Sequence, residues 1–144
     1  MTVATYDPQN IFAKILRGEM PSVKIFEDDT TLAIMDVFPQ VNGHVLVLPK
    51  APSRNILDIA PADLAALIVR VQIIAKAAQH AFKADGITIS QFNEGAGGQT
   101  VFHTHFHIMP RFNGVPLGAH GTGGMADIEV LKAQAEQIKA ALSA

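Results

Sequence analysis

The sequence predicts an α+β domain in which helices pack on an antiparallel sheet of five strands. Its 144 residues are about the size of one domain, and a hydrophobic content of 49% is enough to build a core. Five segments have strand character and three have helical character. Several strands are joined by connections of hairpin length, which favour antiparallel pairing. We expect a single domain over residues 1–144, because no internal repeat or linker interrupts the chain.

The five strands are predicted by apolar alternation and by branched side chains, with turn residues or prolines between them. The expected strands cover residues 23–28, 31–38, 44–50, 87–93 and 102–111. A turn at residues 28–30 should join the first two strands into a hairpin. A glycine-rich loop, NEGAGGQT at residues 93–100, should precede the last strand.

The three helices are predicted by apolar residues at helical spacing. The first covers residues 7–18, with Asp7 as its cap, Pro8 in its first turn and Gly18 at its end. The longest, 61–83, has an apolar stripe of Leu64, Leu67, Ile68, Val71, Ala75, Ala78 and Phe82. The last, 127–142, presents Ile128, Leu131, Ile138 and Leu142.

Composition excludes several classes of function. A net charge of −2 gives no basic excess to hold DNA or RNA, so we expect no nucleic-acid polymer as partner. The absence of cysteine excludes disulfides, thiol nucleophiles and cysteine-based zinc sites. The N-terminus lacks the pattern of a secretory signal, and no apolar run is long enough to span a membrane. We therefore expect a soluble, cytoplasmic protein without a membrane partner.

Three of the six histidines lie in one short stretch, VFHTHFHIMPR, at residues 101–111. Side chains alternate between the two faces of a strand, so His103, His105 and His107 should share one face. An exposed polar face would explain a single histidine, but three in five residues indicate a site.

A metal site meets a geometric objection. Strand residues rise about 3.3 Å each, which places His103 and His107 roughly 13 Å apart, too far to share one ion. A metal would need a ligand from elsewhere, such as His44. Catalysis fits better, because a neutral imidazole is a good nucleophile towards phosphorus near pH 7. We expect no metal and no cofactor.

The loop upstream supports phosphate chemistry. Gly95, Gly97 and Gly98 would let the backbone approach a ligand closely, and Gln99 and Thr100 would add side-chain donors.

These segments resemble the histidine-triad (HIT) family, and its HINT-like branch in particular. The match runs through NIFAKILRGEMPSVKIFEDD, LAIMDVFPQVNGHVLVLPK and NEGAGGQTVFHTHFH, nearly without interruption over residues 9–111. The resemblance implies a HIT domain with its core at 9–111, followed by a connector and helix at 112–144. It also implies a homodimer.

The resemblance implies hydrolysis of purine nucleoside phosphoramidates or related phosphoanhydrides through a covalent nucleotidyl-histidine, with AMP or its phosphoramidates as ligands. By position, His105 is the implied nucleophile. His103 should orient it through backbone and side chain, and His107 should contact phosphate or assist the leaving group. Further catalytic positions are His44, Gln99 and Thr100. The implied nucleotide contacts are Phe12, Ile15, Ile34, Asp36, Val37, Asn93 and Gly98.

Some of these positions have structural alternatives. Phe12 and Ile15 lie in a helical stripe and could belong to the core. Ile34 and Val37 have opposite strand parity, so they can share a site only if the strand bends near Asp36. Thr104 replaces a usually apolar residue of the motif, so we expect its strand face to be less buried than normal.

Two other functions stay open at this point. One is a hydrolase of dinucleoside polyphosphates, which would need an open site beyond the phosphate. The other is a nucleotide-binding regulatory protein with vestigial catalysis.

Overall fold

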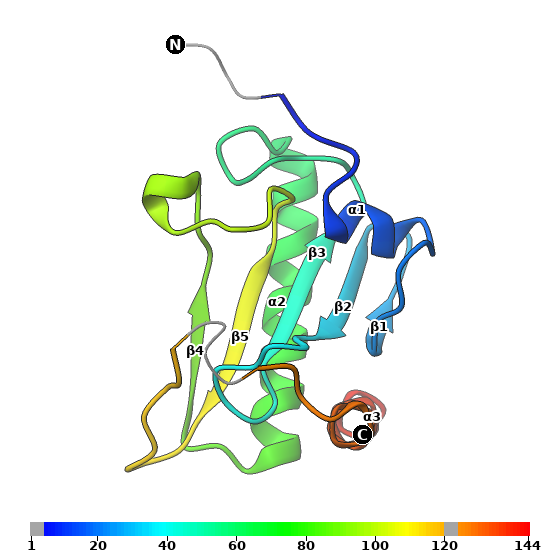
Figure 1. Cartoon of the computed structure of the whole chain (residues 1–144). Coiled ribbons are helices and arrows are strands. Elements are labelled where there is room, and N and C mark those ends of the chain that lie inside the picture. The colour runs from blue at the N-terminus through cyan, green and yellow to red at the C-terminus, as the bar shows by residue number, and fades with distance from the viewer. Residues whose placement is uncertain (1–4, 120–123) are drawn as a thin grey trace.

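The computed structural model, which describes residues 5–119 and 124–144, is built on one antiparallel sheet of five strands (Figure 1). The order across the sheet is β1-β2-β3-β5-β4, which leaves β1 and β4 at its edges. The strands are β1 Lys24–Glu27, β2 Thr31–Met35, β3 Val45–Pro49, β4 Gly86–Ser90 and β5 Phe106–Arg111. The predicted α+β class, with five antiparallel strands in a single domain, is confirmed.

The central strands β2 and β3 are buried on both faces, because side chains alternate across the sheet and each face is covered. One face carries Ala33, Met35 and Val47, and it packs against the two longer helices. The opposite face carries Leu32, Ile34, Leu46 and Leu48, which form a smaller cluster with Phe12 of the first helix. The sheet is therefore the middle layer, with α2 behind it and α1 in front of it in Figure 1.

The first helix, α1 at Ile11–Leu16, is shorter than predicted. The side chain of Asn10, not Asp7, caps it by accepting a hydrogen bond of 2.9 Å from Ala13 N–H. Asp7 instead accepts from the Gln9 N–H in a turn before the helix, which places Pro8 outside the first turn. Gly18, with a φ of 78°, ends the helix as expected.

Helix α2, at Pro61–Phe82, agrees with the prediction in length, but its buried stripe is rotated. Ile68 is 46% exposed, whereas Ile74, which was not expected in the stripe, is fully buried. Helix α3, at Ile128–Leu142, buries Leu131 and Ile138 against α2 and β1. Ile128 is exposed, contrary to the prediction.

No helix in the described part of the chain is both long and apolar enough to cross a membrane. His120, in the connector before α3, lies outside the described residues.

Candidate active site

The histidine stretch is only partly a strand. β5 begins at Phe106, so His107 is the one histidine of the three that pairs in the sheet, opposite Leu46 and Ser90. The prediction of a strand from residue 102 is wrong, because the Thr104 N–H donates to the carbonyl of Ser53, outside the sheet. The three side chains therefore do not form one row.

His105 is held by the backbone of its own motif. Its Nδ1 lies 2.6 Å from the carbonyl oxygen of His103. A carbonyl oxygen can only accept, so Nδ1 carries the proton and Nε2 carries the lone pair of the neutral ring. The ring stands edge-on to Phe12, with 4.8 Å between ring centroids, which further fixes its orientation.

The His103 side chain points away from His105. Its Nε2 donates to the carbonyl of Pro49 at 2.8 Å, and its Nδ1 accepts from the hydroxyl of Tyr6 at 2.6 Å. The ring is fully buried, and this burial lowers the pKa of His103 to about 4. His103 is therefore neutral near pH 7, and its backbone carbonyl is the group that accepts from the His105 ring.

His107 is paired with His44, which precedes β3. The backbone N–H of Gln40 donates to His44 Nδ1 at 3.1 Å, so the neutral His44 ring has its proton on Nε2. That Nε2 lies 2.9 Å from His107 Nδ1, which must accept. The proton of the neutral His107 ring is consequently on Nε2.

Asp36 completes this group. One carboxylate oxygen accepts from the Phe38 N–H at 2.8 Å, and the other lies 3.5 Å from His44 Nε2. The ligand atoms of Asp36, His44 and His107 all lie within 4.8 Å of one another, which is compatible with a metal ion. However, His44 Nδ1 already accepts a backbone proton, so a metal on Nε2 would require an anionic ring or loss of the Gln40 contact. These hydrogen bonds suit a proton between the two rings better than a cation.

A cavity of about 320 Å³ opens beside His105 and His107. Its walls are mostly apolar and come from α1, β2 and the connector before α3. The sequence-predicted residues in its lining are Phe12, Ile15, Ile34, Asp36, Val37, Thr100, His105 and His107. Ile34 and Val37 both reach it because β2 ends at Met35, after which the chain leaves the strand geometry.

A second cavity, of about 230 Å³, meets the first at Thr100, His105 and His107. Its other lining residues are Gln40, Phe92, Gly98 and Gln99, none of which is charged. The two imidazoles therefore stand where a large apolar cavity joins a smaller neutral one.

The side chain of Gln99 is not available as a ligand donor, contrary to the prediction. Its Nε2 donates to the carbonyls of Arg54 and Val101, at 2.7 and 3.0 Å. Its Oε1 accepts from Asn55 Nδ2 and from the Glu94 N–H. Gln99 is buried, and its carboxamide is saturated by protein groups.

Asn93 is also engaged elsewhere. Its Oδ1 accepts from the Ile56 N–H and from Gln91, and its Nδ2 donates to Gln91 Oε1. Asn93 lines neither cavity at the histidines. The phosphate contact expected of this side chain therefore stays a prediction.

Of the three loop glycines, only Gly98 is required by the local geometry. It has a φ of 97°, and a Cβ there would lie 3.3 Å from the Phe92 ring. A Cβ on Gly95 or Gly97 would meet nothing within 4 Å, and neither residue lines a cavity at the site. Of the three glycines, Gly98 is the one that lines the second cavity.

Thr104, expected to be less buried than the family's apolar residue, is fully buried. Its hydroxyl lies 2.6 Å from Ser53 Oγ, so the polar group has a partner inside the core. A serine at position 53 therefore accommodates the unusual residue of the motif.

Sequence reasoning missed several residues of the site. Leu46 lines the first cavity and could have been found, because it shares strand parity with His44. Phe38 could also have been found, because it shares parity with Ile34 and Asp36 in the predicted strand 31–38. Tyr6 and Met125 lie in segments without periodicity, and no local pattern indicates that they approach the histidines.

Comparisons with known proteins agree with this geometry. Residues 17–114 match the model of the HIT domain family. Adenylylsulfatase HINT3 of Arabidopsis thaliana is 40% identical over 101 residues, which are 70% of this chain and 51% of the plant protein. The chain thus spans about half the length of that relative. A HIT-like protein of Mycobacterium tuberculosis is 41% identical over 107 residues, 74% of each chain.

Solved structures of similar proteins extend the match to the whole fold. A HIT-like protein of Bartonella henselae, crystallised with an unknown ligand, is 50% identical with a TM-score of 0.89, covering 95% of this chain and 99% of its own. A zinc-bound histidine triad protein of Mycobacterium smegmatis is 33% identical with a TM-score of 0.82, covering 94% of each chain. The family model matches most of this chain, and His105 and His107 stand where two cavities meet. The chain belongs to the HIT domain family.

Proposed function

We propose that this protein hydrolyses purine nucleoside phosphoramidates, or related nucleotidyl phosphoanhydrides, through a covalent intermediate on His105. The observation that carries the proposal is the hydrogen bond from His105 Nδ1 to the His103 carbonyl, at 2.6 Å. This bond selects the tautomer whose Nε2 lone pair can attack phosphorus. The ring also lines both cavities, so a substrate that spans them would place its phosphorus beside this atom.

In the first step, Nε2 of His105 bonds to phosphorus and the bond from phosphorus to the amine nitrogen breaks. Positive charge that develops on the imidazole is shared with the His103 carbonyl through Nδ1–H. In the second step, water breaks the bond between phosphorus and His105 and releases the nucleoside monophosphate. Over both steps, one water molecule supplies a hydroxyl to phosphorus and a proton to the amine.

His107 acts as a hydrogen-bond donor in this proposal. The hydrogen bonds from the Gln40 N–H through His44 leave the His107 proton on Nε2, and His107 lines both cavities. An N–H at that point can stabilise charge on a phosphate oxygen or contact the departing nitrogen. Thr100, which lines both cavities, offers a hydroxyl to the same group.

The larger cavity suits the nucleoside. Apolar side chains such as Phe12, Ile15 and Ile34 would cover the base, and Asp36 has a carboxylate oxygen for the ribose hydroxyls. Base stacking and sugar recognition would thus come from α1 and the end of β2.

The smaller cavity favours a neutral leaving group. No lysine or arginine of the described chain lines it, whereas a polyphosphate chain would bring several negative charges. This absence of cations weighs against dinucleoside polyphosphates as preferred substrates. The HINT3 relative is called an adenylylsulfatase, so adenosine phosphosulfate belongs in the same comparison.

The test is a panel of adenosine phosphoramidates, adenosine phosphosulfate and diadenosine polyphosphates, assayed with wild type and His105→Ala. We expect the amine phosphoramidates to give the highest kcat/KM and His105→Ala to abolish turnover. His80→Ala, which changes an exposed histidine on α2, is the matched control and should behave as wild type. Quenching in alkali should trap a nucleotidyl adduct only when His105 is present. Near-normal turnover by His105→Ala would overturn the proposal, and nucleotide binding without any adduct would favour a regulatory role.

We further propose a homodimer joined through the open edge at β4. Ile68, Val69 and Ile73 on α2 and Ile89 on β4 are each 46–51% exposed, which is unusual for large apolar side chains. Ile68 and Ile89 line one groove between α2 and the edge strand β4. The outer hydrogen-bonding groups of β4 face no other strand of the described sheet. A second copy would cover both the apolar side chains and the strand edge.

A further inference from the structure

The glycine-rich loop begins with a strained residue. Glu94 has a φ of 62° and a ψ of 162°, a region that is populated almost only by glycine. In the described part of the chain the other non-glycine residue with positive φ is Lys83, which caps α2. A strained conformation of this kind persists only where surrounding contacts impose it.

The contacts that impose it come from a segment after β3. Arg54 binds the Glu94 carboxylate with two parallel hydrogen bonds, from Nε at 2.8 Å and from a terminal nitrogen at 2.9 Å. Asn55 Nδ2 donates to the same carboxylate at 2.6 Å. The guanidinium also stacks over the Phe102 ring at 4.1 Å, so it is fixed on two sides. This is the bidentate geometry in which arginine binds a carboxylate most specifically.

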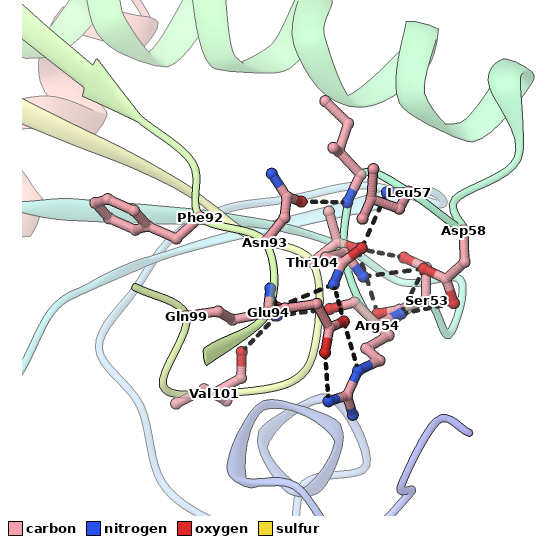
Figure 2. A network of polar contacts seen from close by, with 12 residues as sticks. Ser53, Arg54, Leu57, Asp58, Phe92, Asn93, Glu94, Gln99, Val101 and Thr104 are labelled. Carbon is pink, nitrogen blue, oxygen red and sulfur yellow. Dashed lines mark hydrogen bonds and ion pairs between the residues drawn. The ribbon is translucent and has the colours of Figure 1, made fainter. Parts of the chain in front are cut away.

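The backbone of Glu94 is held as well. Its N–H donates to Gln99 Oε1 at 2.8 Å, and its carbonyl accepts from the N–H groups of Gly97 and Gln99. Gln99 in turn donates to the Arg54 carbonyl, and Asn55 donates to Gln99 Oε1. Figure 2 shows Arg54, Glu94 and Gln99 at the centre of this closed network.

The same segment also fixes the histidine motif. Ser53, next to Arg54, bonds to both the backbone and the hydroxyl of Thr104, which lies between His103 and His105. Segment 53–55 is therefore bonded on one side to the motif that carries the imidazole and on the other to the loop.

We propose that Arg54 and Glu94 are positioning residues that hold loop 94–101 as a preformed wall for the transferred phosphate group. This proposal rests on the proposed function. The loop lines the smaller cavity through Gly98, Gln99 and Thr100, and His105 lines the same cavity. Release of the Glu94 side chain would let its backbone leave the strained conformation, and Thr100 would lose its fixed place at the phosphorus.

The role is one of geometry, because neither charge touches the substrate. Arg54 and Glu94 line neither of the two cavities. Substitution of Arg54 or Glu94 should therefore weaken the binding of the phosphate group and leave the nucleoside contacts of the larger cavity unchanged. A contribution only to stability would weaken both kinds of binding alike.

The experiment compares Arg54→Ala and Glu94→Ala with wild type for turnover of an adenosine phosphoramidate and for binding of AMP and adenosine. We expect kcat to fall at least tenfold, AMP affinity to fall several-fold, and adenosine affinity to stay within twofold. The double variant should be no worse than either single variant, because both remove the same contact. Lys139→Ala, which breaks the exposed ion pair with Glu136 on α3, is the matched control.

The variant Glu94→Gly distinguishes the effect of backbone strain at position 94 from the effect of losing the hydrogen bonds to Arg54. Glycine accepts the backbone conformation but cannot bind Arg54, so this variant should unfold at a higher temperature than Glu94→Ala and still turn over slowly. Turnover within twofold of wild type in Arg54→Ala and Glu94→Ala would overturn the proposal, as would equal losses of AMP and adenosine binding. If wild type hydrolyses nothing in the panel, the proposed function fails, and the AMP-to-adenosine ratio still decides whether the loop is positioned in this way.

Discussion

At the scale of the residue, each histidine of the site has its protonation set by a backbone group. The Pro49 carbonyl fixes His103, the His103 carbonyl fixes His105, and the Gln40 N–H fixes His44 and, through it, His107. Backbone groups cannot change their donor or acceptor character, so these tautomers are held as firmly as the fold itself. Four similar side chains thereby acquire different hydrogen-bonding roles.

The buried His103 predicts a dependence of stability on pH. Its folded pKa of about 4 lies below the ordinary value of 6.5, so the unfolded chain binds more protons between these two values. The contribution of neutral His103 to the free energy of unfolding is fully present above pH 6.5 and decreases as the pH falls towards 4. The loss over this window should be about 3 kcal/mol in the free energy of unfolding.

The measurement is urea unfolding of wild type and His103→Gln at several pH values from 7 to 4. Glutamine does not titrate and can still donate to Pro49, so its stability should fall less steeply over this range. The other buried histidines remain in both proteins, and their effect cancels in the difference. If the stability of the two proteins changed equally with pH, the low pKa assigned to His103 would be contradicted.

Thr104 gives a second prediction at this scale. Thr104→Val keeps the shape of the side chain but leaves the buried hydroxyl of Ser53 without its 2.6 Å partner. We expect a loss of about 1–3 kcal/mol in the free energy of unfolding. Adding Ser53→Ala removes the orphaned group, so the double variant should recover most of the loss in urea denaturation. A double variant as unstable as the sum of the two single changes would argue against this pairing.

At the scale of the element, the sequence predicted the face of a strand on which a side chain lies better than the residue at which the strand begins. Alternation is a local property of a strand, so His107 of β5 lies at the cavity while its neighbours Phe106 and Ile108 lie in the core on the other face. The start of β5 could not be predicted, because Ser53, about fifty positions earlier, takes the Thr104 N–H. Contacts between distant segments decided where pairing begins.

The loop shows the same limit for side-chain roles. Gln99 lies where a phosphate donor was expected, and it lines the smaller cavity. Its carboxamide is occupied by Arg54, Asn55 and Glu94, a network that joins two parts of the chain about forty positions apart. Neither segment alone carries a signal for that network, so position in a motif was a poor guide to the use of the side chain.

The cap of α1 connects this element to ligand binding. A helix of six residues has little stability of its own, and the Asn10 side chain caps it by accepting from the Ala13 N–H at 2.9 Å. Asn10→Ala should cost about 1 kcal/mol of stability and weaken adenosine binding, because α1 carries Phe12 and Ile15 into the larger cavity.

The measurement is calorimetric titration with adenosine alongside thermal unfolding. Asn10→Ser is the conservative control, since serine also caps helices, and it should bind adenosine as wild type does. Unchanged adenosine affinity in Asn10→Ala would show that α1 does not need its cap to form the cavity wall.

At the scale of the whole molecule, the two faces of the sheet have different roles: one carries the main core and the other carries the candidate site. α2 and α3 cover one face with the main core, while α1 and the loops leave cavities on the other. The strand order puts β5, with His107, next to the edge strand β4, so the site lies one strand away from the open edge. An association at β4 would therefore bring a second copy close to the smaller cavity.

The last prediction concerns that edge. Ile89→Lys places a charge in the exposed apolar patch beside β4 and should convert a dimer into a monomer, because the charge would have to be buried in the interface. Sedimentation velocity at micromolar concentrations distinguishes the two states. Val130→Lys, at a similarly exposed apolar position on α3, is the control and should leave the dimer intact. A monomeric wild type, or an Ile89→Lys variant that stays dimeric, would contradict association through this edge. If monomeric Ile89→Lys keeps the kcat of wild type, each site is complete within one chain, whereas a lower kcat means that the second copy closes the smaller cavity.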